Sequence, residues 1–204
     1  MAVQARERLL TAAEELFYAE GIRAVGVERI LTESGVGRAS FYRHFASKED
    51  LVIAALTRTD ERWRAWLRET IDGYSLPPAE RPAALFDALA DWLDGAGYRG
   101  CAFINAMIEA ADRDSPVHRV AVAHKEAVTD YADRLLAAAG REDHATLAPE
   151  LMLLIEGAVV TSMREGTSEA AVRAGRIARV LLARQPDPRD AVRRRLRVVT
   201  GGMR

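Results

Sequence analysis

The chain has 204 residues, which is long enough for one large domain or for a small domain joined to a medium one. Hydrophobic residues make up 49% and charged residues 29%, an ordinary balance for a globular protein, and no apolar run reaches the roughly 18 residues of a membrane span. The single cysteine, Cys101, excludes an internal disulfide framework, and the N-terminus lacks a signal-peptide core, so we expect a soluble, cytoplasmic protein.

The net charge of −1 gives no overall attraction to a polyanion, but the charges are unevenly distributed. Residues 1–48 hold seven Lys and Arg against six Asp and Glu, residues 49–183 hold fifteen against twenty-two, and residues 184–204 hold seven against two. Such segregation allows one end of the chain to approach phosphates while the acidic middle stays away.

The first predicted elements are two helices followed by a turn. Across residues 3–20, apolar residues recur at spacings of three and four, which predicts an amphipathic helix that Gly21 ends. A shorter helix then carries Ile30 on its apolar face. The sequence Gly-Val-Gly at 35–37 indicates a turn with Val36 pointing inward, because glycine accepts the positive φ that ends a helix.

A further short helix is predicted to begin near Arg38 and to carry side chains that suit DNA. Between Gly35 and Lys48 every charged residue is basic, and no carboxylate occurs. A helix-turn-helix places its second helix in the major groove and needs a basic surface there. The residues expected to contact DNA are Gly37, Arg38, Ala39, Ser40, Tyr42, Arg43, His44 and Lys48.

The expected contacts fall into two kinds. Arg38 stands at the start of the helix, from which its guanidinium can reach guanine O6 and N7; the alternative is an exposed arginine that only solvates the helix. Ser40, Tyr42 and His44 fall on faces that can touch phosphate or sugar, and such contacts fix the register without reading the sequence. The two phenylalanines of the segment are expected in the core.

Several residues of this stretch stand at fixed offsets, namely Ile30, Ser34-Gly35-Val36, Ser40, Tyr42, Phe45, Ser47-Lys48-Glu49 and Leu51. Their order resembles the DNA-binding domain of the TetR-type transcriptional regulators. The resemblance implies that Tyr42 and Lys48 bind the DNA backbone. Two positions depart from the pattern, because Gly26 stands where a hydroxyl cap is usual and Gly37-Arg38-Ala39 replaces a common Ser-x-Gly.

The remainder of the chain predicts six more helices, separated by glycine, proline and cap signals. Ser47 caps the first of them, and Ser115-Pro116 forms the cap and first residue of the fourth. The fifth is apolar on nearly all sides and must be covered all round. The expected ranges are 48–74, 82–93, 101–111, 116–139, about 149–166 and 168–184.

No strand-period run appears, so we expect an all-α fold of about nine helices. Residues 1–47 are expected to form a three-helix helix-turn-helix domain. Residues 48–184 are expected to form a helical effector-binding and dimerisation domain, and residues 185–204 a basic tail.

Aromatic residues and methionines at helical spacing are usually core, but together they could line a pocket, and the resembled family keeps a cavity among these helices. The pocket residues expected on this ground are Trp63, Trp66, Phe86, Leu89, Trp92, Phe103, Met107, Tyr131, Met152 and Glu156. A buried carboxylate is costly, so Glu156 either pairs with an arginine, lies at the edge of a dimer or faces a polar ligand group.

The two predicted helices nearest the C-terminus imply an apolar surface that one chain cannot easily cover. Pairing them with their copies would make a four-helix interface under two-fold symmetry. The segments RGCAFINAMIEAADRDSPVH and LLIEGAVV resemble the ligand-binding and dimerisation part of an AcrR-like subgroup of the family. The expected interface residues are Leu154, Ala158, Ala170, Ala174, Ile177, Ala178 and Leu181.

Other chemistry is not indicated. No two histidines have the i, i+4 spacing of metal ligands, so neither a metal nor another cofactor is expected. Cys101 is expected to be a buried structural thiol rather than a redox switch. No nucleophile–base pair or phosphate loop is visible, so we expect no enzyme. The tail is expected to be solvated or partly disordered, with non-specific DNA affinity as the alternative.

Together these features predict a ligand-responsive transcriptional regulator. It is expected to act as a repressor, to bind a pseudo-palindromic double-stranded DNA operator as a homodimer, and to be released by a small, largely apolar effector. One competing hypothesis is a helical small-molecule-binding protein or enzyme without a DNA-binding role. The other is an architectural or activating DNA-binding protein without an effector.

Overall fold

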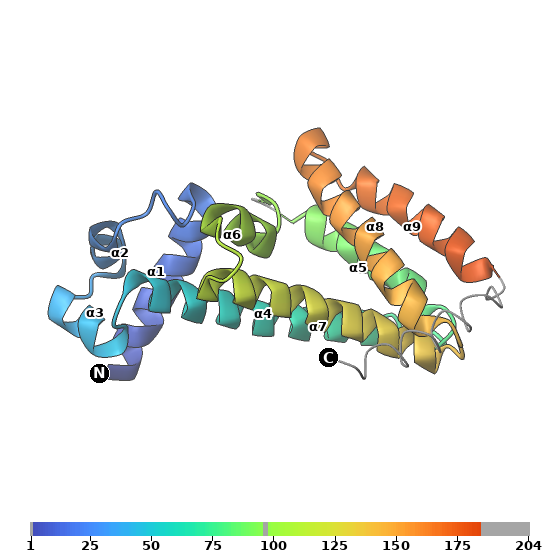
Figure 1. Cartoon of the computed structure of the whole chain (residues 1–204), viewed down its shortest axis with the longest axis horizontal. Coiled ribbons are helices and arrows are strands. Elements are labelled where there is room, and N and C mark those ends of the chain that lie inside the picture. Colours follow the sequence, from blue (N-terminus) through green and yellow to red (C-terminus); the bar gives the residue numbers. More distant parts are fainter. Residues whose placement is uncertain (1, 96–97, 185–204) are drawn as a thin grey trace. The chain divides into compact units, whose positions relative to one another are not determined.

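Nine α-helices and no β-strand are found in residues 2–95 and 98–184, the parts of the chain that this computed structural model describes (Figure 1). The all-α prediction is therefore confirmed. The basic tail at 185–204 lies outside the described residues. The chain divides into two compact units, Met1–Trp66 with Arg99–Glu126 and Leu67–Tyr98 with Ala127–Arg204, and each is described by itself.

The first unit contains the predicted helix-turn-helix and more. Besides the three N-terminal helices it includes the first part of α4, all of α6 and the first part of α7. Its helices are α1 (Ala2–Glu20), α2 (Val27–Ser34), α3 (Arg38–His44), α4 (Lys48–Gly73), α6 (Ala102–Ala110) and α7 (Pro116–Ala138).

A continuous apolar core lies beneath α1, α2 and α3. Its largest fully buried members include Phe41 and Ile30, both with no exposed surface, and Phe45 closes the same cluster. Phe41 and Phe45 are therefore core residues, as their positions predict. The remaining buried members are Leu9, Leu10, Ala13, Leu16, Val25, Val36, Leu51 and Ala55.

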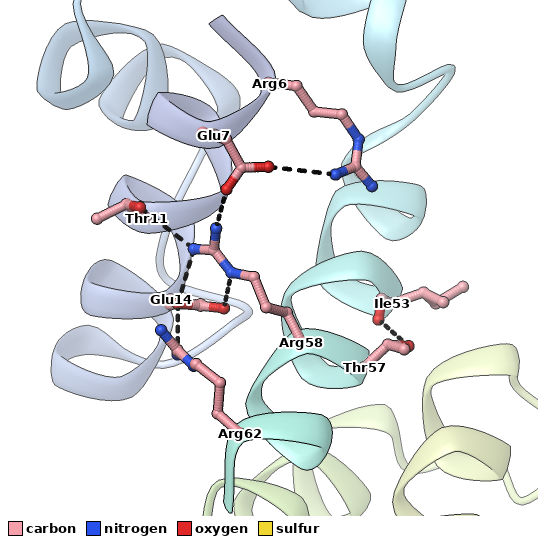
Figure 2. Close-up of polar contacts among 8 residues, drawn as sticks. All are labelled: Arg6, Glu7, Thr11, Glu14, Ile53, Thr57, Arg58 and Arg62. Carbon is pink, nitrogen blue, oxygen red and sulfur yellow. Dashed lines mark hydrogen bonds and ion pairs between the residues drawn. The ribbon is translucent and has the colours of Figure 1, made fainter. Parts of the chain in front are cut away.

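A charged network fastens α4 to α1 within this unit (Figure 2). The guanidinium of Arg58 donates to both carboxylate oxygens of Glu14, at 2.6 and 2.8 Å, and to Glu7 Oε2 at 2.7 Å. Arg62 reaches Glu14 Oε2 as well, at 2.7 Å. A planar guanidinium that bonds a carboxylate at two atoms fixes direction as well as distance, so the first half of α4 is held in one orientation on α1.

The second unit is built around α5 (Arg81–Leu93), α8 (His144–Glu165) and α9 (Glu169–Ala183). The last of these packs against both of the others. Arg141 closes the C-terminal end of α9, because its Nη1 donates to the carbonyls of Leu182 and Arg184 at 2.8 and 2.9 Å. Its Nε and Nη2 meanwhile bond Asp143.

The predicted helix bounds hold within one residue except at the start of α8. This helix begins at His144, about five residues before the predicted start, and Pro149 lies inside it. Two contacts stabilise the earlier start: His144 Nδ1 lies 2.6 Å from Asp133 Oδ1, and the Leu147 N–H donates to the Asp143 carbonyl at 3.0 Å. Pro149 has no backbone N–H to donate, so one helical hydrogen bond is missing there, but the turn that begins at His144 still forms.

Among the described helices, α8 alone has the length and apolar composition that would suffice to cross a membrane. The prediction that no such run exists is wrong by that measure. Eight of its residues are buried inside the second unit, which is the packing of a core helix: Leu147, Ala148, Leu151, Met152, Ile155, Ala158, Val159 and Ser162.

Candidate nucleic-acid interface

The turn between α2 and α3 has the geometry that its glycines predict. Gly35 adopts the left-handed conformation, with φ 59° and ψ 28°, and ends α2. A Cβ at Gly35 would lie 2.5 Å from Nη2 at the flexible end of Arg8, which can move aside, so it is the left-handed backbone rather than the space that favours glycine here. Val36 is 7% exposed and points into the core, as predicted. The turn therefore fixes the direction in which α3 leaves.

α3 has one buried and one exposed face. Phe41 is buried, whereas Arg38, Tyr42 and Arg43 are exposed on the other side, Tyr42 by 51%. Gly37 and Ala39 are also exposed, so no bulky side chain covers the start of the helix. The structure thus presents five of the eight predicted DNA contacts on a helix whose opposite face is fixed in a core.

An acidic residue that the sequence interpretation passed over lies beside the predicted base reader. Arg38 Nη2 forms an ion pair with Glu28 Oε1 of α2, and both side chains are largely exposed. On the same helix Arg43 Nη2 donates to Ser40 Oγ at 3.1 Å. The segment between Gly35 and Lys48 lacks carboxylates, but the fold brings one to it from ten residues before Arg38.

His44 and Lys48 are less exposed than the other predicted contacts. The Nε2 atom of His44 is buried and has no hydrogen-bond partner in the structure. The Nζ atom of Lys48 donates to the Ile22 carbonyl at 2.5 Å, and partial burial lowers the pKa of Lys48 against an opposing effect of Glu109. An ammonium carries three donors, so Lys48 has capacity for a second acceptor.

The residues expected around an effector divide between the two units. In the first unit, the Phe103 ring stacks on His124 with 3.7 Å between centroids, and the Trp63 ring meets His124 edge-on at 5.3 Å. Trp66 lies 6.1 Å from Trp63. Met107, on α6, is partly buried.

A hydrogen-bonded group of His124, Asp60 and Arg64, which the sequence did not predict, lies beside these aromatic rings. His124 Nδ1 lies 2.6 Å from Asp60 Oδ1, and Arg64 bonds both oxygens of Asp60 at 2.6 to 2.9 Å. Burial lowers the pKa of His124 to about 4, against the opposing effect of the hydrogen bond with Asp60. The ring is therefore neutral near pH 7, and its Nδ1 donates to the carboxylate.

In the second unit the expected pocket residues differ in exposure. Phe86, Leu89 and Met152 are buried. Trp92 contacts Tyr98 edge-on at 5.1 Å between ring centroids. Tyr131 is partly buried, and this burial raises the pKa of its phenol. The remaining member, Glu156 of α8, is only partly buried.

Four of the seven residues expected in a dimer interface are buried within the single chain. Ala158, Ala170, Ala174 and Ala178 are at most 6% exposed, and a side chain buried in its own subunit offers almost no surface to a second. Leu154 and Leu181 are partly buried, and Ile177 is 52% exposed. The large apolar side chains that α8 and α9 do expose are Leu153, Val160, Met163, Val172, Ile177 and Val180.

Cys101 is a free, buried thiol, as predicted. Within residues 2–95 and 98–184, no group of three or more His, Cys, Asp or Glu side chains is arranged to hold a metal ion.

Three N-terminal helices with a left-handed turn between α2 and α3, and with an exposed basic face on α3, define the class of helix-turn-helix DNA-binding proteins. Comparison with known proteins gives the family. The model for bacterial regulatory proteins of the tetR family matches residues 9–55, and the model for a tetracyclin repressor-like C-terminal domain matches residues 78–178.

A solved TetR-family transcriptional regulator from Streptomyces coelicolor is 35% identical, with a TM-score of 0.81, over 89% of this chain and 97% of that one. The regulator YjdC of Escherichia coli K12 is 26% identical over 74% of this chain and 80% of its own length. An uncharacterized regulator of Lactococcus lactis is 32% identical over 53% of this chain, and the match spans only 56% of that relative. The chain belongs to the TetR family of bacterial transcriptional regulators, which bind DNA and are not enzymes.

Proposed function

We propose that this protein is a transcriptional repressor that binds a pseudo-palindromic operator as a homodimer and leaves it when a small, largely apolar molecule binds. It would act in the cytoplasm, where operator DNA is found. The observation that carries the proposal is the exposed face of α3, where Arg38, Tyr42 and Arg43 stand over buried Phe41. A core-anchored helix that exposes basic and hydroxyl groups suits the major groove.

Arg38 is the proposed base reader. In the free protein its guanidinium is paired with Glu28, but both side chains are largely exposed. Exposed ion pairs contribute only about 0 to 1 kcal/mol, whereas a bidentate contact with guanine contributes about 1 to 3 kcal/mol of base discrimination. The ion pair with Glu28 is therefore weak enough for a guanine edge to replace it when DNA binds.

The other predicted contacts position the helix. Tyr42 and Arg43 are exposed beside Arg38 and can reach phosphates on either side of the groove. Lys48 can donate to a phosphate while it keeps its bond to the Ile22 carbonyl, because two of its three donors remain. Ser40 and His44 are partly buried, and Ser40 accepts a hydrogen bond from Arg43 that helps to hold this guanidinium.

Arg38→Ala tests the proposal. The variant should bind the cognate duplex about 1 to 3 kcal/mol more weakly and should relax the preference at one base position, measured by fluorescence anisotropy. Arg113→Ala is the control, because it removes the same charge from an exposed site in the loop before α7. An equal loss of affinity for the cognate duplex and for random duplex DNA would remove Arg38 from sequence reading.

The proposed partner of α8 and α9 is a second copy of the same chain. Both helices expose large apolar side chains although their other faces are packed, and a two-fold axis would bring each set against its own copy. Glu156 is three residues from Leu153 and four from Val160, so it shares their helix face and would lie at the edge of this interface. The interface proposed here rests on exposed residues such as Leu153, Ile177 and Val180 rather than on the buried alanines.

The proposed effector site draws on the aromatic residues of the first unit. Trp63, Phe103 and His124 offer flat apolar surface in the first unit, with Asp60 and Arg64 as neighbouring polar groups. Aromatic walls with a few fixed polar groups are typical of small-molecule sites. An effector that binds more tightly to a conformation unsuited to DNA would lower operator affinity, by at most the factor of that preference.

A further inference from the structure

Helix α6 is joined at both of its ends to the DNA-binding head, which consists of α1, α2, α3 and the loops between them. Before the helix begins, Tyr18 of α1 accepts a hydrogen bond from the Arg99 N–H at 2.7 Å and donates to the Gly100 carbonyl at 3.1 Å. Arg99 Nη1 also donates to the Ala19 carbonyl at 3.1 Å. The start of α6 is thus attached to the last turn of α1.

The other end of α6 reaches the loop between α1 and α2. The two carboxylate oxygens of Glu109 accept hydrogen bonds from the backbone N–H groups of Ile22 and Arg23, at 3.0 and 2.7 Å. The Ile22 carbonyl accepts a bond from Lys48 Nζ of α4. A single loop residue therefore has both of its backbone groups bonded to charged side chains, one from α6 and one from α4.

The loop is shaped to receive this carboxylate. Gly21 has φ 92°, and a Cβ placed there would lie 3.3 and 3.4 Å from the two Glu109 oxygens. Four residues further along, Val25 is fully buried in the core beneath the helix-turn-helix, and α2 begins at Val27. A displacement of the loop would therefore also displace the first turn of α2.

The C-terminal end of α6 is held in an unfavourable backbone conformation. Ala111 has φ 59° and ψ −36°, and the Asp112 N–H donates to the Ala110 carbonyl at 2.6 Å in a tight three-residue turn. Residues other than glycine adopt such a conformation only where their surroundings impose it. A shift of this end of α6 would separate Glu109 from the loop.

We propose that Glu109 is a positioning residue of the DNA-binding head. Its carboxylate holds the loop at residues 21–26 and, through it, the angle at which α2 and α3 meet DNA. Without this carboxylate the two amides lose their acceptor and the head loses operator affinity. This inference rests on the proposed DNA-binding function, but its structural part can be tested without DNA.

The first experiment measures amide hydrogen exchange by NMR in the full chain, for wild type, Glu109→Gln and Glu126→Gln. A glutamine retains the length of the side chain, but one carboxylate oxygen becomes an amide donor that faces a backbone N–H. We expect exchange at Ile22 and Arg23 to be roughly tenfold faster or more in Glu109→Gln. Glu126→Gln removes the same charge from an exposed position on α7 and should leave both amides unchanged.

The second experiment measures affinity for a duplex that the wild-type protein selects from a random pool. We expect Glu109→Gln to bind it roughly tenfold more weakly, and random duplex DNA no more weakly than wild type. The direction of the change in affinity separates a positioning role from a simple charge effect, because removal of a negative charge by itself strengthens binding to DNA. Glu126→Gln should bind no more weakly than wild type.

The outcomes are distinguishable. Unchanged exchange at Ile22 and Arg23, or faster exchange with unchanged affinity for the selected duplex, would overturn the role of Glu109. If the wild-type protein selects no duplex, the proposed function fails, whereas the exchange experiment still decides whether Glu109 holds the loop. If Glu109→Gln does not fold, Glu109→Asp supplies the same two measurements, because it keeps the charge but is one methylene too short.

Discussion

His124 is a titratable side chain almost fully enclosed in the first unit. Only 5% of its surface is exposed, and its ring lies against Phe103 and Trp63 with Nδ1 on Asp60. Burial disfavours the charged imidazolium more strongly than Asp60 favours it, so the pKa of His124 falls from 6.5 to about 4. Protonation is therefore easier in the unfolded chain than in the folded one.

This pKa shift predicts how stability depends on pH. Above pH 6.5 the ring is neutral in both states, and between pH 6.5 and 4 only the unfolded chain takes up the proton. The free energy of unfolding should therefore fall by about 2 kcal/mol between pH 7 and pH 5, measured by urea denaturation. In the same window Asp60 contributes little, because Arg64 and His124 together outweigh burial and keep the pKa of its carboxyl low.

The comparison variant is His124→Gln, which has no group that titrates in this range. Its stability should change by much less than 2 kcal/mol between the same pH values. Equal losses in the variant and the wild type would assign the pH dependence to other groups. A wild type that gains stability on acidification relative to His124→Gln would show that His124 is charged in the folded protein.

At the scale of elements, the contact between α1 and α4 depends on one guanidinium. Arg58 bonds Glu14 at two atoms and Glu7 at a third, and the Glu14 side chain is only 12% exposed (Figure 2). Removal of Arg58 leaves a largely enclosed carboxylate with a single exposed partner, Arg62. Hydrogen bonds to charged groups that are lost in this way cost about 1.5 to 3 kcal/mol.

Arg58→Met should therefore lower the free energy of unfolding by about 1.5 to 3 kcal/mol, measured by chemical denaturation at pH 7. Arg62→Met is a matched control, because Arg62 bonds the same carboxylate but is 62% exposed. Exposed pairs contribute about 1 kcal/mol or less, so the control should lose no more than that. Similar losses in the two variants would mean that the contacts of Arg58 contribute no more to stability than the exposed contact of Arg62.

The elements whose signals are local could be predicted from sequence. Gly35 and Val36 form the predicted turn, and Ser47 and Ser115 cap the helices that follow them, with Oγ accepting from the N–H of Asp50 and of His118 at 3.1 Å. The information for each lies within a few residues of the chain. The same reasoning placed Phe41 and Phe45 in the core of the head.

Contacts between distant residues could not be predicted in this way. Glu28 meets Arg38 across ten positions, Arg58 meets Glu14 across 44, His124 meets Asp60 across 64 and Glu109 meets Ile22 across 87. A chain with 29 basic and 30 acidic residues offers too many possible pairings for composition to choose one. Apolar periodicity likewise cannot tell whether a stripe faces its own subunit or another, and so Ala170 and Ala174 were expected at an interface.

For the whole molecule, the distribution of charge matters more than its sum. A net charge of −1 provides little general attraction to DNA. Affinity must then come from local contacts of α3 and of Lys48 beside it, and one short helix of seven residues reads only a few base pairs. A second copy, joined through the exposed apolar faces of α8 and α9, would double the site and give it two-fold symmetry.

The most direct test of this account is selection of bound duplexes from a random pool by the full-length protein. We predict an inverted repeat whose half-site centres lie about one helical turn, roughly 10 base pairs, or a multiple of that apart. A variant carrying Ile177→Glu and Val180→Glu places charges on the exposed apolar face of α9 and should be monomeric by light scattering, and should select single half-sites with lower affinity. Enrichment of no sequence by the wild-type protein, or of a single site without a repeat, would contradict the account.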